Sequence, residues 1–174
     1  MGKRMDDGID FRWALRREDP ERILRLVAAT GFFSSEEQQI AIELAEERFA
    51  KGVASGYEFI TAEQNGSLVG YVCYGPIAGT KSSYDLYWIA VHPELQGRGL
   101  GQRLMDLAEI EIARAGGKRV YIDTSSRKQY SPTRAFYERV GYRKDALLED
   151  FYAPGDGKVI YVKVLDFAQG QTRV

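Results

Sequence analysis

A period of two in the apolar positions predicts the strands of this chain. Ile9, Phe11, Trp13 and Leu15 alternate with charged or small residues, so we expect a first strand that is buried on one face. Further strands are expected where β-branched and aromatic residues dominate short runs, namely residues 57–63, 68–76, 84–91, 120–124, 146–152 and 159–164. Asn65–Gly66 suits a type I′ hairpin turn, and the turn-rich run 154–157 is expected to join the last two strands.

Capping residues and a longer apolar period predict the helices. Asp19 followed by Pro20 is typical of an N-cap and a first helical residue, and this helix is expected to stop at Gly31. Ser34 with Glu37 matches the capping box of a second helix, which carries an acidic face and ends at Gly52.

The apolar positions of the second helix and two later helices follow the same period. In the second helix, Ile40, Leu44 and Phe49 stand among charged residues and are expected to form its apolar stripe. Apolar residues recur at helical spacing from Leu100 to Ile112, and residues 132–140 form a short helix. The predicted order is therefore βααβββαβαββ, an α/β fold with a mixed sheet, which we expect to form one domain over residues 1–174.

Composition narrows the classes of partner. The 174 residues carry a formal net charge of −1, which argues against a dedicated nucleic-acid or anionic-membrane binder. One cysteine, Cys73, and one histidine, His92, are too few for an internal disulfide or a Cys/His zinc site, so no metal is expected. No secretion signal or membrane span is encoded in these residues, so we expect a cytoplasmic protein.

A glycine-rich turn carries the most specific chemical signal. It lies between the strand 84–91 and the helix that begins near Leu100, and it comprises Gln96, Gly97, Arg98, Gly99, Leu100 and Gly101. Free N–H groups at such a helix N-terminus favour a phosphate group, and Arg98 can add positive charge. We therefore expect an anionic ligand at this turn.

This turn has three alternative interpretations. A Walker A loop needs Lys and then Ser or Thr after its last glycine, but Gln102 and Arg103 follow Gly101. A Rossmann fingerprint needs a third glycine where Gln102 stands, although Asp123 lies roughly where a ribose-binding acid is expected. The glycines could also serve only as a tight turn.

The pattern Q-x-x-G-x-G over residues 96–101, preceded by Val91, His92 and Pro93, resembles the acetyl-CoA motif of the GNAT superfamily of N-acetyltransferases. The order of elements is similar to that of the family over about residues 9–165. This resemblance implies a mostly antiparallel central sheet flanked by helices, splayed at its two central parallel strands. It also implies acetyl-CoA as co-substrate, with its pyrophosphate held by the glycine turn.

The resemblance also assigns roles along the central strand. Main-chain groups of Ile89 and Val91 would bond the pantetheine amides, and a backbone N–H in the run Ile89, Ala90, Val91 would polarise the thioester oxygen as an oxyanion hole does. Such a donor stabilises the negative charge that develops when an amine attacks the thioester.

A second stretch, residues 131–142, resembles the late helix of the family. By this likeness Tyr137 is the general acid that protonates the leaving thiolate, which a phenol can do at neutral pH. Tyr130 stands where many members have a cofactor-binding Asn, so Tyr130, Ser131 or Thr133 would make this contact with the cofactor.

Transfer to an amine also requires a proton acceptor, because a lysine-like amine is protonated at neutral pH. Asp85 lies near the start of the central strand at the position of a catalytic Glu in some relatives, and it could act through water. Glu149 and Asp150 are alternative bases. Cys73 as an acyl-carrying nucleophile would need an activating base, and the chain has a single histidine.

The expected activity is direct attack of a primary amine on acetyl-CoA in a ternary complex. The alternative is a domain that binds acyl-CoA as a sensor or regulatory module without catalysis. The acceptor could be a small molecule, a peptide or a protein, and acidic residues near the expected acceptor groove favour a cationic amine. We expect no nucleic-acid or membrane partner, and either a monomer or a homodimer.

Overall fold

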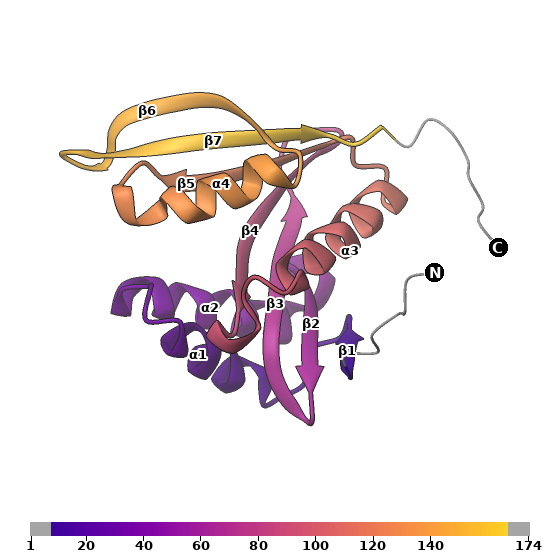
Figure 1. The fold of residues 1–174 in the computed structure, drawn as a ribbon. Helices are drawn as coiled ribbons and strands as arrows, with labels where there is room; N and C mark the ends of the chain where they lie inside the picture. Colours follow the sequence, from indigo (N-terminus) through magenta and orange to yellow (C-terminus); the bar gives the residue numbers. More distant parts are fainter. Residues whose placement is uncertain (1–7, 167–174) are drawn as a thin grey trace, which may run out of the picture. The chain divides into compact units, whose positions relative to one another are not determined.

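A computed structural model describes residues 8–166 of the chain. Its helices and strands follow the predicted order βααβββαβαββ (Figure 1). The elements are β1 Ile9–Arg12, α1 Asp19–Ala29, α2 Ser35–Lys51, η1 Gly52–Ser55, β2 Glu58–Gln64, β3 Ser67–Pro76, β4 Ser83–Val91, η2 Pro93–Leu95, α3 Leu100–Arg114, β5 Arg119–Ser125, η3 Lys128–Tyr130, α4 Ser131–Arg139, β6 Arg143–Ala153 and β7 Asp156–Val164.

The strands form one seven-stranded mixed sheet in the order β1-β2-β3-β4-β5-β7-β6. The pairs β1–β2, β2–β3, β5–β7 and β6–β7 are antiparallel, whereas β4 and β5 run parallel. The parallel pairing joins residues 83–85 to residues 119–121. The predicted α/β class with a mostly antiparallel sheet is therefore confirmed.

The chain divides into two compact units, and β4 and α3 each contribute to both. Within the described range, the first unit comprises residues 8–75 and 88–108, and the second comprises residues 76–87 and 109–166. The expectation of one domain over residues 1–174 stays a prediction, and residues 1–7 and 167–174 lie outside the described range.

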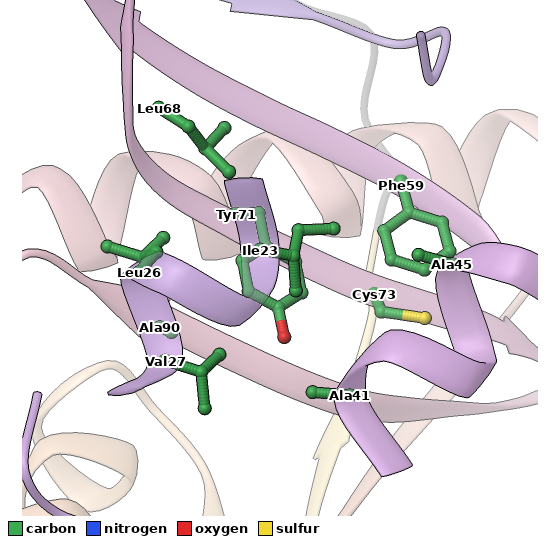
Figure 2. Close-up of a cluster of buried hydrophobic side chains, with 10 residues drawn as sticks. All are labelled: Ile23, Leu26, Val27, Ala41, Ala45, Phe59, Leu68, Tyr71, Cys73 and Ala90. Atoms are coloured by element: carbon green, nitrogen blue, oxygen red, sulfur yellow. The ribbon is translucent and has the colours of Figure 1, made fainter. Parts of the chain in front are cut away.

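The core of the first unit lies between α1, α2 and the strands. Ile23, Leu26 and Val27 of α1 gather with Ala41 and Ala45 of α2 (Figure 2). The strand residues in this cluster are Phe59, Leu68, Tyr71, Cys73 and Ala90. Burial of this apolar surface holds both helices on the sheet.

The second unit packs α4 along β5 and β7 (Figure 1). Tyr137 of α4 contacts Tyr161 of β7, with ring centroids 5.9 Å apart. A buried carboxylate from α3, Glu109, accepts hydrogen bonds from the Tyr142 hydroxyl at 3.0 Å and from the Lys163 ammonium at 2.7 Å. These charge-assisted bonds satisfy a carboxylate that would otherwise be costly to bury.

The start of the chain differs from the sequence prediction. β1 ends at Arg12, so Trp13 and Leu15 lie outside the strand, and Trp13 is 47% exposed. Asp19 is not the N-cap of α1: Glu18 holds that position, and Asp19 is the first helical residue. Its carboxylate is fully buried and accepts the Arg16 N–H at 2.6 Å, which ties the segment between β1 and α1 to the start of the helix.

The second helix has the predicted ends but a different buried face. The Ser34 hydroxyl accepts the Glu37 N–H at 3.2 Å, and the Glu37 carboxylate accepts the Ser34 N–H at 2.8 Å, so the capping box is confirmed. Ile40 and Phe49 are about half exposed, however, and small residues, Ala41 and Ala45, face the core. Small side chains let the helix approach the strands closely.

Both predicted hairpins are present, one with a tighter turn. Asn65 and Gly66 have φ values of 51° and 78°, as a type I′ turn requires. In the last hairpin, Ala153 pairs with Asp156, so the turn consists only of Pro154 and Gly155, and residues 156 and 157 belong to β7.

Candidate functional site

In the first unit, the glycine turn follows η2, the short helix after β4, and leads into α3. Gly97 and Gly99 have φ values of 72° and 85°, a backbone conformation that L side chains rarely adopt. No atom lies within 4 Å of the position that a Cβ would take at either glycine. The turn is therefore open to solvent on the side where a ligand would approach.

The side chain of Gln96 holds this turn to the strand. Its Nε2 donates to the Val91 carbonyl at 3.0 Å, which uses one of the two lone pairs of that oxygen. The Gln96 side chain is thus engaged within the protein, and its conformation fixes how the turn leaves β4. Arg98 is exposed and projects from the same turn.

The N-terminus of α3 is anchored by close packing. Leu100 is 2% exposed, so it offers a ligand its main-chain N–H and not its side chain. A Cβ at Gly70 of β3 would stand 3.1 Å from Leu104 and 3.4 Å from Leu100, and only glycine permits this approach without adjustment. The N–H groups of Leu100, Gly101 and Gln102 in the first turn have no acceptor inside the helix, whereas that of Arg103 donates to the Gly99 carbonyl at 3.0 Å. They can bind an anion such as a diphosphate.

The end of β4 carries the three residues expected to face the thioester. Ala90 is buried, and Ile89 and Val91 are partly buried. Immediately after them, the His92 N–H donates to the Val69 carbonyl of β3 at 2.8 Å. This bond fixes the strand end from which the glycine turn departs.

In the second unit, Asp85 faces an open pocket of about 310 Å³. The other lining residues are Ile77, Thr80, Ser83, Tyr121, Asp123, Lys158 and Ile160. Burial and then the neighbouring Asp123 raise the pKa of Asp85, while Lys158 opposes this shift. A carboxylate whose pKa is raised in a pocket is a stronger base than an ordinary carboxylate, which suits it to accept a proton.

Tyr137 lies on the opposite face of the sheet of the second unit. Its contact with Tyr161 places it on that face, because Ile160 and Lys158, which alternate with Tyr161 along β7, line the pocket. Burial and the nearby Tyr161 raise the pKa of Tyr137 well above its ordinary value. The hydroxyl is therefore protonated at neutral pH and able to donate.

The residues before α4 are held by an arginine that the sequence analysis did not single out. Arg134 donates to the carbonyls of Ser125 at 2.7 Å and Arg127 at 3.0 Å, and to the Ser131 hydroxyl at 3.1 Å. Tyr130 is buried with the Arg127 guanidinium 5.4 Å from its ring centroid, whereas Thr133 is partly exposed. Of the two, Thr133 has the more accessible side chain.

The other chemical candidates have different surroundings. Cys73 is fully buried, and burial and then Glu58 raise the pKa of its thiol well above the ordinary value, which disfavours a nucleophilic thiolate. Asp150 accepts the Gly155 N–H at 2.7 Å and so stabilises the last hairpin, while Glu149 is exposed. Neither carboxylate lines the Asp85 pocket.

The residues that the sequence predicted for the site fall into two groups, one in each unit. Residues 89–91 and 96–101 lie within one continuous stretch of the first unit, residues 88–108, and Asp85, Tyr130, Thr133 and Tyr137 belong to the second. Sequence reasoning did not connect Asp123 and Lys158 with Asp85. The alternation of side chains along residues 121–123 could have indicated that Asp123 shares a face with Tyr121. The position of Lys158 beside Asp123 depends on the register between β5 and β7, which the sequence does not show.

Within residues 8–166, no three His, Cys, Asp or Glu side chains are arranged to hold a metal ion. Over the same residues, no helix has the length and apolar character needed to cross a bilayer.

Comparisons with known proteins agree with this geometry. The family model of the acetyltransferase (GNAT) domain matches residues 55–144. The N-alpha-acetyltransferase RimI of Mycobacterium tuberculosis is 31% identical over 106 residues, which are 60% of this chain and 64% of that relative. The matched part is therefore less than two thirds of that relative's length.

Solved structures share the fold over nearly the whole chain. A structure from Desulfovibrio desulfuricans, described as an acetyltransferase of the GNAT family, is 41% identical, with a TM-score of 0.88, and the match covers 90% of this chain and 98% of that one. An aminoglycoside 6′-N-acetyltransferase complexed with coenzyme A is 16% identical, with a TM-score of 0.69 and coverage of 89% and 96%, which shows a shared fold. This chain belongs to the GNAT family of acetyltransferases.

Proposed function

We propose that this protein transfers the acetyl group of acetyl-CoA to a primary amine by direct attack in a ternary complex. The observation that carries the proposal is the open glycine turn at the N-terminus of α3, with Gly97 and Gly99 in left-handed conformations and Gln96 bonded back to β4. Family membership supports acetyl-CoA as the ligand of this turn.

The cofactor contacts follow from the chemistry of this segment. The N–H groups of residues 97–102 would bind the diphosphate of coenzyme A, and exposed Arg98 would add charge. The main chain of Ile89, Ala90 and Val91 would bind the pantetheine amides and the thioester oxygen. The further cofactor contact carried by the family resemblance would be made by Thr133, which is partly exposed, or by the buried Tyr130.

In the proposed reaction, Asp85 takes the proton that makes the amine nucleophilic, directly or through a water molecule. The amine nitrogen then forms a bond to the acetyl carbon, and a backbone N–H within residues 89–91 stabilises the negative oxygen. The carbon–sulfur bond breaks, and the Tyr137 hydroxyl donates its proton to the thiolate. The opposite faces occupied by Asp85 and Tyr137 support separate roles in accepting and donating protons.

A cationic amine is the acceptor class that the charge of the pocket favours. The described lining residues include two carboxylates, Asp85 and Asp123, and one ammonium, Lys158. The compared proteins include an N-alpha-acetyltransferase and an aminoglycoside 6′-N-acetyltransferase. The acceptor panel should therefore contain both peptides and amino sugars.

The test measures free coenzyme A thiol after incubation with acetyl-CoA and a panel of amines: an alanine-initiated peptide, a lysine peptide, spermidine and kanamycin. We expect thiol release with at least one acceptor. For that acceptor, Tyr137→Phe should lower kcat by at least about 100-fold, as loss of a general acid does. Tyr152→Phe is the matched control, because Tyr152 is half exposed on β6.

Two outcomes would count against the proposal. Wild-type turnover by Tyr137→Phe across pH 6 to 9 would remove its role as the general acid. Thermal stabilisation by acetyl-CoA without thiol release on any acceptor would favour a non-catalytic acyl-CoA sensor.

A further inference from the structure

The pocket that contains Asp85 holds an ion pair that the proposed reaction does not use. Lys158 of β7 pairs with Asp123 of β5. Asp85 lies opposite Tyr121 in the parallel pairing, and Asp123 follows Tyr121 by two residues, so both aspartates point to the same face of the sheet. Lys158 reaches this face from the strand on the other side of β5.

The Lys158 ammonium is held from two directions. It pairs with Asp123 on one side and lies 4.7 Å from the ring centroid of Phe151 on the other. Burial alone would lower the pKa of Lys158, but the bond to Asp123 and the neighbouring negative groups raise it. The side chain therefore stays cationic over the whole working pH range.

Asp85 lines the same pocket as Asp123 and Lys158 but forms no ion pair with Lys158. Among residues 8–166, the ionisable groups that line its pocket are Tyr121 and Asp123 from β5 and Lys158 from β7. The segment before β4 contributes only the uncharged side chains of Ile77 and Thr80, and the start of β4 adds the uncharged Ser83. Asp123 repels a negative charge on Asp85, and Lys158 attracts it.

We propose that Asp123 and Lys158 are positioning residues for Asp85: by pairing with each other they keep the lysine off Asp85 and set the pH at which Asp85 can accept a proton. This inference rests on the proposed function, in which Asp85 is the base. If Asp123 were neutral, the lysine would be free to pair with Asp85. If the lysine were absent, the two carboxylates would repel each other without compensation.

The test follows the carboxyl carbon of Asp85 by NMR in protein labelled with ¹³C-aspartate, with the Asp85 signal assigned by its loss in Asp85→Asn. We expect Lys158→Met to raise the titration midpoint of Asp85 by about one pH unit, and Asp123→Asn to lower it by about the same amount. These shifts are at the low end for a neighbouring charge because the pocket is open to solvent.

Two further variants control for charge and folding. Lys144→Met removes an exposed lysine of β6. Lys144 lies opposite Tyr161 in the strand pairing, so its side chain is on the face of the sheet away from Asp85, and this variant should leave the titration midpoint of Asp85 unchanged. Lys158→Arg keeps the positive charge and should stay near the wild-type midpoint. If Lys158→Met does not fold, Asp123→Asn and Lys158→Arg still test the assignment.

With an acceptor in hand, the acid limb of kcat/KM against pH should move in the same direction as each midpoint. Unchanged midpoints in both Asp123→Asn and Lys158→Met, or shifts in the same direction, would overturn the inference. The titration needs no acceptor, so absence of acetyl transfer by the wild-type protein would count against the proposed function alone.

Discussion

Replacing the buried carboxylate of Asp19 should destabilise the first unit strongly. The side chain is 0% exposed and accepts four hydrogen bonds: from Arg12 Nη1 at 2.8 Å, Arg12 Nη2 at 3.0 Å, Arg22 Nη1 at 3.0 Å and the Arg16 N–H at 2.6 Å. In Asp19→Asn one oxygen would become an amide nitrogen, which cannot accept these bonds.

The expected cost follows from the two bonds that lose their acceptor. Each bond to a charged group contributes about 1.5–3 kcal/mol, and breaking a buried ion pair costs about 3–5 kcal/mol. Glu63 still pairs with both arginines, so the cost should lie at the low end, about 3 kcal/mol. For a protein of this size, that free energy lowers Tm by roughly 6–12 °C.

Thermal and urea unfolding followed by circular dichroism would measure this loss. The matched control is Glu21→Gln in the same helical turn, because Glu21 forms an exposed pair with Arg25 that contributes at most about 0.5 kcal/mol. If Asp19→Asn were as stable as the control, the inference that this carboxylate stabilises the junction of β1 and α1 would be wrong.

Two further predictions concern packing and pH. Gly117→Ala should lower stability by about 1–3 kcal/mol, measured by thermal unfolding, because the new Cβ would stand 2.3 Å from Ile112 and 2.8 Å from the Tyr84 ring; an unchanged Tm would contradict this. Burial acts to raise the pKa of Glu63, but hydrogen bonds from two arginines lower it below its ordinary value of 4.5. The ionised carboxylate therefore stabilises the fold above pH 4.5, and this stabilisation is lost as the pH falls through the lowered pKa. The stability difference between wild type and Glu63→Gln should therefore be full at neutral pH and shrink in acid, as urea unfolding at a series of pH values would show.

Local signals predicted much of this fold. The Ser34–Glu37 capping box and the Asn65–Gly66 turn form as expected because each depends on neighbouring residues alone. The glycine turn could likewise be located because its left-handed positions, Gly97 and Gly99, are a local backbone requirement.

Periodicity alone did not identify the face that each element buries. Ile40 and Phe49 have the spacing of a core stripe, yet Ala41 and Ala45 face the strands, because close packing between layers selects small side chains there. Asp19 has the chemistry of an N-cap, but its carboxylate is buried and pairs with Arg12 of β1 and with Arg22 of its own helix.

The sequence by itself was sufficient to predict the order of elements, the mixed sheet and the glycine turn, because their causes are side-chain alternation, caps and backbone dihedral angles over a few residues. Only the tertiary structure placed Asp123 and Lys158 around Asp85, and Tyr137 on the opposite face. These placements depend on the register of β4, β5 and β7, where a shift of one residue would turn every side chain to the other face. Register is decided by packing between residues far apart in the chain, which no local pattern records.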